Sequence, residues 1–203
     1  MLIVKEYLDD SISNPLRAQQ LTGMKVATSF GTLTEINNRS AIDCLSYMKW
    51  KVSILELINR AGNQSNLTVF GVPFHKAINH QILIEKLNNE LKDSGSQWDL
   101  VKLSQISETS SNKLVVLTDP GHELIPQSLL SKCNLVFLFM DAFEKLDEYQ
   151  LQILESWKSL ELNIQIVLVN TRDYNLERFL GELPKKRSKI RRRLKAIILK
   201  FSK

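Results

Sequence analysis

The sequence predicts an α/β fold with a doubly wound, mostly parallel sheet flanked by helices. Six short apolar segments have strand character, and helical patterns separate most of them. Three of these segments, 113–118, 134–140 and 164–169, are almost entirely apolar, as expected when helices cover both faces of a sheet. Alternating strands and helices favour parallel pairing with right-handed crossovers.

The remaining elements follow from the same two periodicities. The strand segments are 24–28, 67–72, 99–103, 113–118, 134–140 and 164–169. The helical patterns cover 40–61, 76–93, 124–132, 145–160 and 174–181, and residues 104–112 have loop composition. We therefore expect an N-terminal segment (1–39), an α/β domain (40–183) and a C-terminal tail (184–203).

Composition excludes several classes of protein. Of the 203 residues, 43% are hydrophobic and 24% are charged, which is ordinary for a globular chain. No apolar run approaches the roughly 18 residues of a transmembrane helix, and the first residues lack a signal-peptide pattern. The two cysteines, Cys44 and Cys133, lie in apolar patterns and indicate a reducing compartment. The three histidines have no metal-ligand spacing, so no metal is expected.

Positive charge is concentrated in the tail. The chain has a net charge of +5, yet residues 185–203 alone carry ten basic side chains and no acidic one, so the remainder is net acidic. Apolar residues recur through the tail at helical spacing, at Ile190, Leu194, Ile197, Ile198 and Phe201. Pro184 before them favours a helix boundary. The sequence thus predicts a basic amphipathic helix.

Three roles are open for this tail. It can lie on an anionic membrane surface, pack on the body as a solvated helix, or bind nucleic acid. The single aromatic residue, Phe201, and the lack of a stacking or base-reading motif argue against nucleic acid. For the membrane role, the basic positions expected to contact anions are Lys185, Lys186, Arg187, Lys189, Arg191, Arg192, Arg193 and Lys195.

Residues 67–77 have the layout of a phosphate-binding loop, with a strand, a glycine (Gly71), a short loop and a lysine (Lys76). The motif G-x-x-x-x-G-K-[ST] uses glycines to turn backbone N–H groups inward and a hydroxyl to bind Mg²⁺. Here the spacing is one residue short, His75 replaces the second glycine, and Ala77 replaces the hydroxyl. Pro73 also lacks an N–H. A plain strand-to-helix turn with a solvated lysine is the alternative.

A second acidic position follows an apolar strand. In the stretch LVVLTDPG (114–121), Asp119 ends the apolar strand, at the point where phosphate-loop proteins hold Mg²⁺. The alternative is that Asp119 begins a turn with Pro120 and Gly121. No other carboxylate stands at a recognisable catalytic spacing from a lysine or histidine, so no catalytic residue is predicted.

Residues 4–30, VKEYLDDSISNPLRAQQLTGMKVATSF, resemble the segment that follows the second transmembrane helix of bacterial polysaccharide co-polymerases. In that family the segment leads into a cytoplasmic tyrosine-kinase domain with a P-loop NTPase-like fold. The matching positions are Glu6, Tyr7, Leu8, Asp9, Ile12, Pro15, Leu21, Thr22, Gly23 and Val26. The similarity spans most of 4–180, and it puts the family's Walker A loop on 67–77 and its late acidic strand on 114–121.

The chain departs from this family at the functional positions. The family's ExxRxxR helix motif, used in ring assembly, falls on Asp43, Ser46 and Lys49, so both arginines are lost. The strand within 98–106 does not end in the family's acidic motif, and the C-terminal tyrosine cluster is replaced by the basic tail. The nucleotide-site positions that remain are degenerate: Gly71, Lys76, Ala77 and Asp119. We therefore expect a pseudokinase without bound ATP or Mg²⁺.

The resemblance implies a non-catalytic scaffold on the cytoplasmic side of the bacterial inner membrane. Such a domain would serve capsule or exopolysaccharide biosynthesis and export, including chain-length control. Its expected partners are copies of itself, polysaccharide assembly and export proteins and, through the tail, the anionic membrane. Because Met1 stands directly before the matching segment, we expect an excised part of a longer chain with upstream transmembrane segments.

Two alternative functions require the chain to bind a nucleotide. One is a divergent ATP-binding NTPase or tyrosine kinase in which Lys76 holds phosphates and Asp119 holds Mg²⁺. The other is a MinD/ParA-like ATPase that associates with membrane through its C-terminal helix. Both normally need the glycines that this loop lacks.

Overall fold

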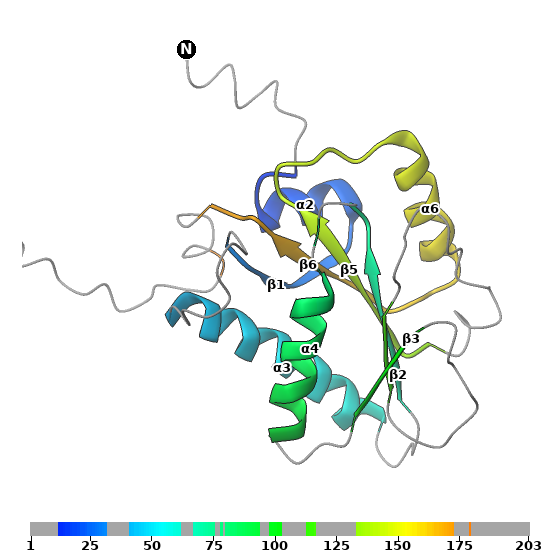
Figure 1. Cartoon of the computed structure of the whole chain (residues 1–203). Helices are drawn as coiled ribbons and strands as arrows, with labels where there is room; N and C mark the ends of the chain where they lie inside the picture. The colour runs from blue at the N-terminus through cyan, green and yellow to red at the C-terminus, as the bar shows by residue number, and fades with distance from the viewer. Residues whose placement is uncertain are drawn as a thin grey trace, which may run out of the picture.

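The computed structural model of the chain describes residues 12–31, 41–61, 67–75, 78, 80–93, 98–102, 113–116, 133–172 and 179. Within these ranges the chain folds into a parallel β-sheet with helices on both faces (Figure 1). The α/β class that the alternating pattern predicts is therefore confirmed.

Six strands form the described sheet, in the order β1-β6-β5-β2-β4-β3, and every neighbouring pair is parallel. They are β1 (Lys25–Ser29), β2 (Thr68–Pro73), β3 (Asp99–Lys102), β4 (Lys113–Val116), β5 (Leu135–Asp141) and β6 (Ile164–Val169). Each coincides with a predicted strand to within about two residues at either end, the usual uncertainty of such boundaries. Strands β5 and β6 are buried at every position, which explains their uninterrupted apolar sequences.

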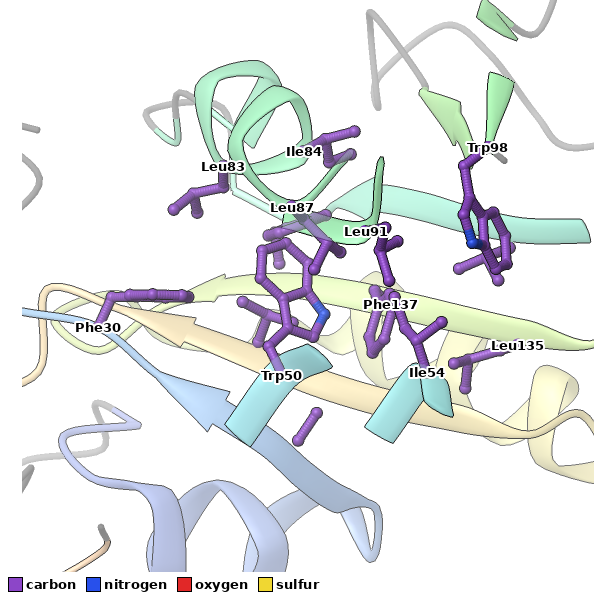
Figure 2. Close-up of a cluster of buried hydrophobic side chains, with 14 of the residues drawn as sticks. Phe30, Trp50, Ile54, Leu83, Ile84, Leu87, Leu91, Trp98, Leu135 and Phe137 are labelled. Carbon is purple, nitrogen blue, oxygen red and sulfur yellow. The ribbon is translucent and has the colours of Figure 1, made fainter. Parts of the chain in front are cut away.

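Helices α3 (Ala41–Ala61) and α4 (His80–Asp93) cover one face of the sheet. The apolar residues of α4 recur every four positions, so Leu83, Leu87 and Leu91 all point into this layer (Figure 2). From α3, Trp50 meets the rings of Phe137 and Phe139 edge-on, at centroid distances of 5.3 and 5.7 Å. Such edge-to-face aromatic pairs add to the stabilisation that burial provides.

Helices α2 (Pro15–Thr22) and α6 (Glu148–Ser159) cover the opposite face. Helix α2 begins at Pro15 because the Asn14 side chain accepts the N–H of Arg17, and it ends at Gly23, whose φ of 68° few other residues adopt. Helix α6 begins with a capping box, in which Asp147 and Gln150 each bond the other's backbone N–H.

The described residues of the N-terminal segment, 12–31, pack with the same sheet as the rest of the described chain. Strand β1 pairs with β6 along the edge of the sheet, and Ala18 of α2 is fully buried in the core of the second face. Helix α2 was not predicted, although its capping residue, its first-turn proline and its terminal glycine are all visible in the sequence. Residues 12–31 therefore belong with the sheet.

Several expectations fall outside the described residues. These are the helix over 124–132, the loop over 104–112, the tail over 184–203 and, except for Phe179, the helix over 174–181. Helix α4 begins at His80, four residues later than predicted. In the part of the chain that the structure describes, no helix combines the length and apolarity needed to cross a membrane.

Candidate functional site at the carboxyl edge of the sheet

Two neighbouring strands, β2 and β5, send their following helices to opposite faces of the sheet. Strand β2 is followed by α4, on the face that α3 shares, whereas β5 is followed by α6, on the face that α2 shares. At such a point, the carboxyl ends of parallel strands form the place where open α/β sheets bind ligands. The residues that end β2 and β5 are therefore the candidate site. The predicted phosphate loop falls on the first of these two ends.

Gly71 lies inside β2, not in a loop after it. It is in register with Val116 of β4 on one side and with Phe137 of β5 on the other. A Cβ atom at this position would lie 2.4 Å from Cδ1 of Ile84 and 3.1 Å from Cε2 of Phe139. The absence of a side chain thus allows α4 to approach the sheet closely, which is a packing requirement and needs no ligand.

The chain after Gly71 stays bonded to the sheet. Pro73 ends β2 and has no N–H, and the N–H of Phe74 donates to the carbonyl of Phe139 at 2.8 Å. The carbonyl of Phe74 accepts the side-chain amide of Gln150 at 2.9 Å. A phosphate nest needs successive N–H groups turned toward one point. From Gly71 to Phe74 the backbone instead pairs with neighbouring strands, and the Phe74 carbonyl bonds Gln150 of α6.

His75 joins the ends of β2 and β5. It is buried, and its Nδ1 accepts the backbone N–H of Asp141 at 2.9 Å. Because Nδ1 is the acceptor, the ring is neutral with its proton on Nε2. Nε2 is buried and has no hydrogen-bond partner among the described residues. The imidazole therefore links the end of β2 to the end of β5.

The Asp141 carboxylate occupies the same edge. It is buried, one oxygen accepts the N–H of Phe143 at 2.8 Å, and the other accepts the side-chain amide of Asn170. Asn170 itself adopts a left-handed φ of 58° at the end of β6. Its N–H bonds to Gly31, so the carboxylate links β5 to the ends of β6 and β1. These bonds satisfy the carboxylate within the fold.

Burial lowers the pKa of His75, because the charged imidazolium would lose its hydration. The Lys145 carbonyl and then the nearby carboxylates of Glu144, Asp141 and Asp147 oppose that shift without reversing it. Protonation would also break the bond from the Asp141 N–H, since Nδ1 could no longer accept. The unfolded chain therefore binds this proton more readily than the folded chain does.

The side chains of His75 and Asp141 do not bond each other. The imidazole bonds the backbone of Asp141, and the carboxylate bonds a different amide and Asn170. In the described residues, no group of three histidine, cysteine or acidic side chains could hold a metal ion.

The predicted site residues are only partly described. Gly71 lies in β2, whereas Lys76, Ala77, Asp119 and the basic positions of the tail lie outside the described residues. Of the positions that match the family's ring-assembly motif, Ser46 is buried and donates to the carbonyl of Ser29 at 2.7 Å. Ser46 thus faces the sheet and is not available to a partner.

Sequence reasoning missed Asp141 and Asn170 and gave His75 only the role of a missing glycine. A signal for Asp141 was present in the sequence, because it directly follows the apolar segment 134–140 just as Asp119 directly follows the predicted strand 113–118. The partners of these residues come from strand ends far apart in sequence, and only the sheet order brings them together.

No protein-family model matches the chain, and no curated protein matches it either.

Proposed function

We propose that this chain is a non-catalytic interaction domain that keeps a P-loop NTPase-like α/β fold without its chemistry. The main support for this proposal is that the backbone of residues 71–74 is bonded into the sheet. Gly71 is packed under Ile84, Pro73 has no N–H, and the N–H of Phe74 bonds Phe139. Phosphoryl transfer depends on positioning and on electrostatic stabilisation of the phosphates, so a strand end whose amide at Phe74 is bonded and whose Pro73 has none is poorly suited to it.

The bonds around His75 and Asp141 favour a structural role for this edge. Both groups are buried and each accepts bonds from the fold itself, which makes the edge rigid. A scaffold domain needs a fixed surface more than it needs an open site. The helices and loops around this edge are then the surfaces that partners contact.

The N-terminal segment is fastened to the same edge. The N–H of Ile12 donates to the carbonyl of Glu144 at 3.1 Å, and the N–H of Ser13 donates to the carbonyl of Ala142 at 2.7 Å. If the residues before Ile12 lead from a membrane segment, as the resemblance implies, then the β5–α6 loop is where the domain meets its anchor.

We place the domain in capsule or exopolysaccharide biosynthesis and export on the strength of the N-terminal resemblance. Its partners in this proposal are copies of itself and the polysaccharide assembly or export proteins. The basic tail adds contact with anionic lipid, at roughly 1 kcal/mol for each lysine or arginine close to the surface.

Co-sedimentation with vesicles tests the membrane part of the proposal. The full chain should bind vesicles that contain anionic lipid, binding should weaken as salt rises, and neutral vesicles should not retain it. In the test variant, Arg191, Arg192 and Arg193 are replaced by glutamate in the full chain, and this variant should bind anionic vesicles more weakly than the wild-type chain. Equal binding by the variant, or tighter binding of the wild-type chain to RNA than to anionic vesicles, would refute the membrane role.

A second candidate function has one observation in its favour. The ends of β2 and β5 form the switch point where α/β sheets bind ligands, and a divergent NTPase, kinase or MinD/ParA-like ATPase would use that place. Lys76 and Asp119 would be its phosphate and metal residues. Saturable binding of Mg-ATP that depends on Lys76 would favour this candidate over the scaffold.

A further inference from the structure

The outward side of α3 carries apolar side chains where polar ones are usual. Leu45, Met48 and Val52 are spaced by three and four residues, so they share one side of the helix. Their exposed fractions are 36%, 63% and 50%, whereas Trp50 and Ile54 on the inward side are fully buried. We call these three residues the α3 stripe. A helix with apolar residues on two sides commonly has a second packing partner.

After β6, Phe179 contacts a lysine of α3 that borders this stripe. The ammonium group of Lys49 lies 3.5 Å from the centroid of the Phe179 ring and donates to the Phe179 carbonyl at 3.1 Å. Lys49 is four residues after Leu45 and three before Val52, so it borders the α3 stripe. Phe179 packs against the core on the α2 and α6 side, and its contacts with Lys49 bring it to the side of α3 that borders the stripe, five residues before the tail begins at Pro184.

The tail has the dimensions and the pattern to cover the stripe. As a helix, residues 185–203 would be about 28 Å long, and the 21 residues of α3 span about 31 Å. The first apolar residue of the tail, Ile190, is eleven residues after Phe179, a distance that an extended chain covers up to roughly 36 Å. No long linker is needed.

We propose that the apolar side of the tail packs on the α3 stripe of the same chain and leaves the basic side chains facing outward. The apolar residues of the tail are Ile190, Leu194, Ile197, Ile198 and Phe201. Packing two apolar stripes removes both from water, and the lysines and arginines on the other side of the tail remain hydrated. The tail then forms a fixed cationic surface.

The anchor at Phe179 favours the tail over a second copy as the occupant of the stripe. A segment tethered beside its site binds at a high effective concentration, whereas a second copy must be recruited from solution. The inference does not depend on the proposed function, because it concerns packing within one chain. It would stand if the outward cationic surface met no membrane.

Paramagnetic broadening from a nitroxide on Cys44 tests the proposal on the full chain. Cys44 is exposed, and at 1.5 Å per residue it lies about 12 Å along α3 from Val52. Cys133 is half-buried, and this burial raises the pKa of its thiol to about 12, so labelling of the native chain favours Cys44. The readout is the loss of amide signal for residues 190–201 relative to the reduced, diamagnetic label.

The proposal predicts strong broadening of the tail amides in the wild-type chain and its loss in the double variant Met48→Gln, Val52→Gln. Glutamine keeps helix propensity and adds no charge that would attract or repel the tail. Leu151→Gln on α6, also exposed, is the matched control and should retain the broadening. A second variant, Leu194→Gln with Ile197→Gln, removes the tail's apolar side without touching α3 and should also abolish it.

Three outcomes would overturn the proposal. The tail amides could remain sharp in the wild-type chain. Broadening could occur when nitroxide-labelled chains are mixed with separate isotope-labelled chains, which would make a second copy the occupant. Broadening of the tail could also require anionic vesicles, which would make the membrane surface responsible for ordering it.

Discussion

The substitution Gly71→Ala should destabilise the fold because its new methyl group would collide with Ile84. The added Cβ would lie 2.4 Å from Cδ1 of Ile84 and 3.1 Å from the Phe139 ring, and both side chains are buried. Overpacking of this kind costs about 1–3 kcal/mol. Replacing glycine also reduces the conformational entropy of the unfolded chain, which offsets about 0.4–1 kcal/mol of that cost. We therefore expect a net loss of about 1–2 kcal/mol in the free energy of unfolding.

A double-mutant cycle isolates that contact. The change Ile84→Val deletes Cδ1 and should alone cost about 0.5–1.5 kcal/mol. Together with Gly71→Ala it should cost at least about 1 kcal/mol less than the two single changes added, because the valine leaves room for the new methyl group. Ile166→Val is the control: it lies two strands away on β6, about 10 Å from β2, and should add to Gly71→Ala independently.

Urea unfolding followed by tryptophan fluorescence measures the cycle. Trp50 and Trp98 are buried in the layer next to Gly71, so their emission reports loss of this core. If the free energy of unfolding falls by about 2 kcal/mol per molar urea, Gly71→Ala should lower the urea midpoint by about 0.5–1 M. The reasoning would be refuted if Gly71→Ala were neutral or if the cycle with Ile84→Val were additive within about 0.5 kcal/mol.

Three further predictions concern titration, capping and thiol reactivity. Burial lowers the pKa of His75 in the folded chain, so the stability that this residue supplies should be complete above pH 6.5, the ordinary pKa of histidine, and should decline as the pH falls below that value. The variant His75→Asn keeps an acceptor but does not titrate. Its urea midpoint should therefore change less between pH 5 and 8 than that of the wild-type chain. Asp147→Ala should cost about 1 kcal/mol by removing the cap of α6, whereas Glu155→Ala, in the exposed middle of that helix, should be close to neutral in the same assay. A thiol reagent at pH 8 should titrate Cys44 rapidly, and Cys133 only after denaturation, since burial raises the pKa of Cys133 to about 12; rapid reaction of both thiols in the native chain would contradict the described packing.

Much of the fold could be predicted because apolar periodicity follows directly from burial. The uninterrupted runs at 134–140 and 164–169 correspond to β5 and β6, which are covered on both faces. The long pattern at 40–61 corresponds to α3. Helix α2 was missed because it spans only eight residues and exposes Leu16 and Leu21, so its apolar pattern is weak and its caps are the better signal.

The candidate site could be predicted less well because it depends on strand order. The sequence located the end of β2, but nothing local indicates that Asp141 donates its N–H to His75 or that Asn170 binds the Asp141 carboxylate. Gly71 illustrates the same limit. A glycine before a loop and a glycine under a helix look alike in sequence, and only the position of Ile84 distinguishes them.

Calorimetric titration of the full chain with Mg-ATP, up to millimolar concentration, tests the central claim most directly. That claim is that residues 71–74 are bonded into the sheet and cannot surround a triphosphate. We expect no saturable heat and the same trace for the wild-type chain and for Lys76→Ala. Saturable binding by the wild-type chain that Lys76→Ala abolishes would contradict it.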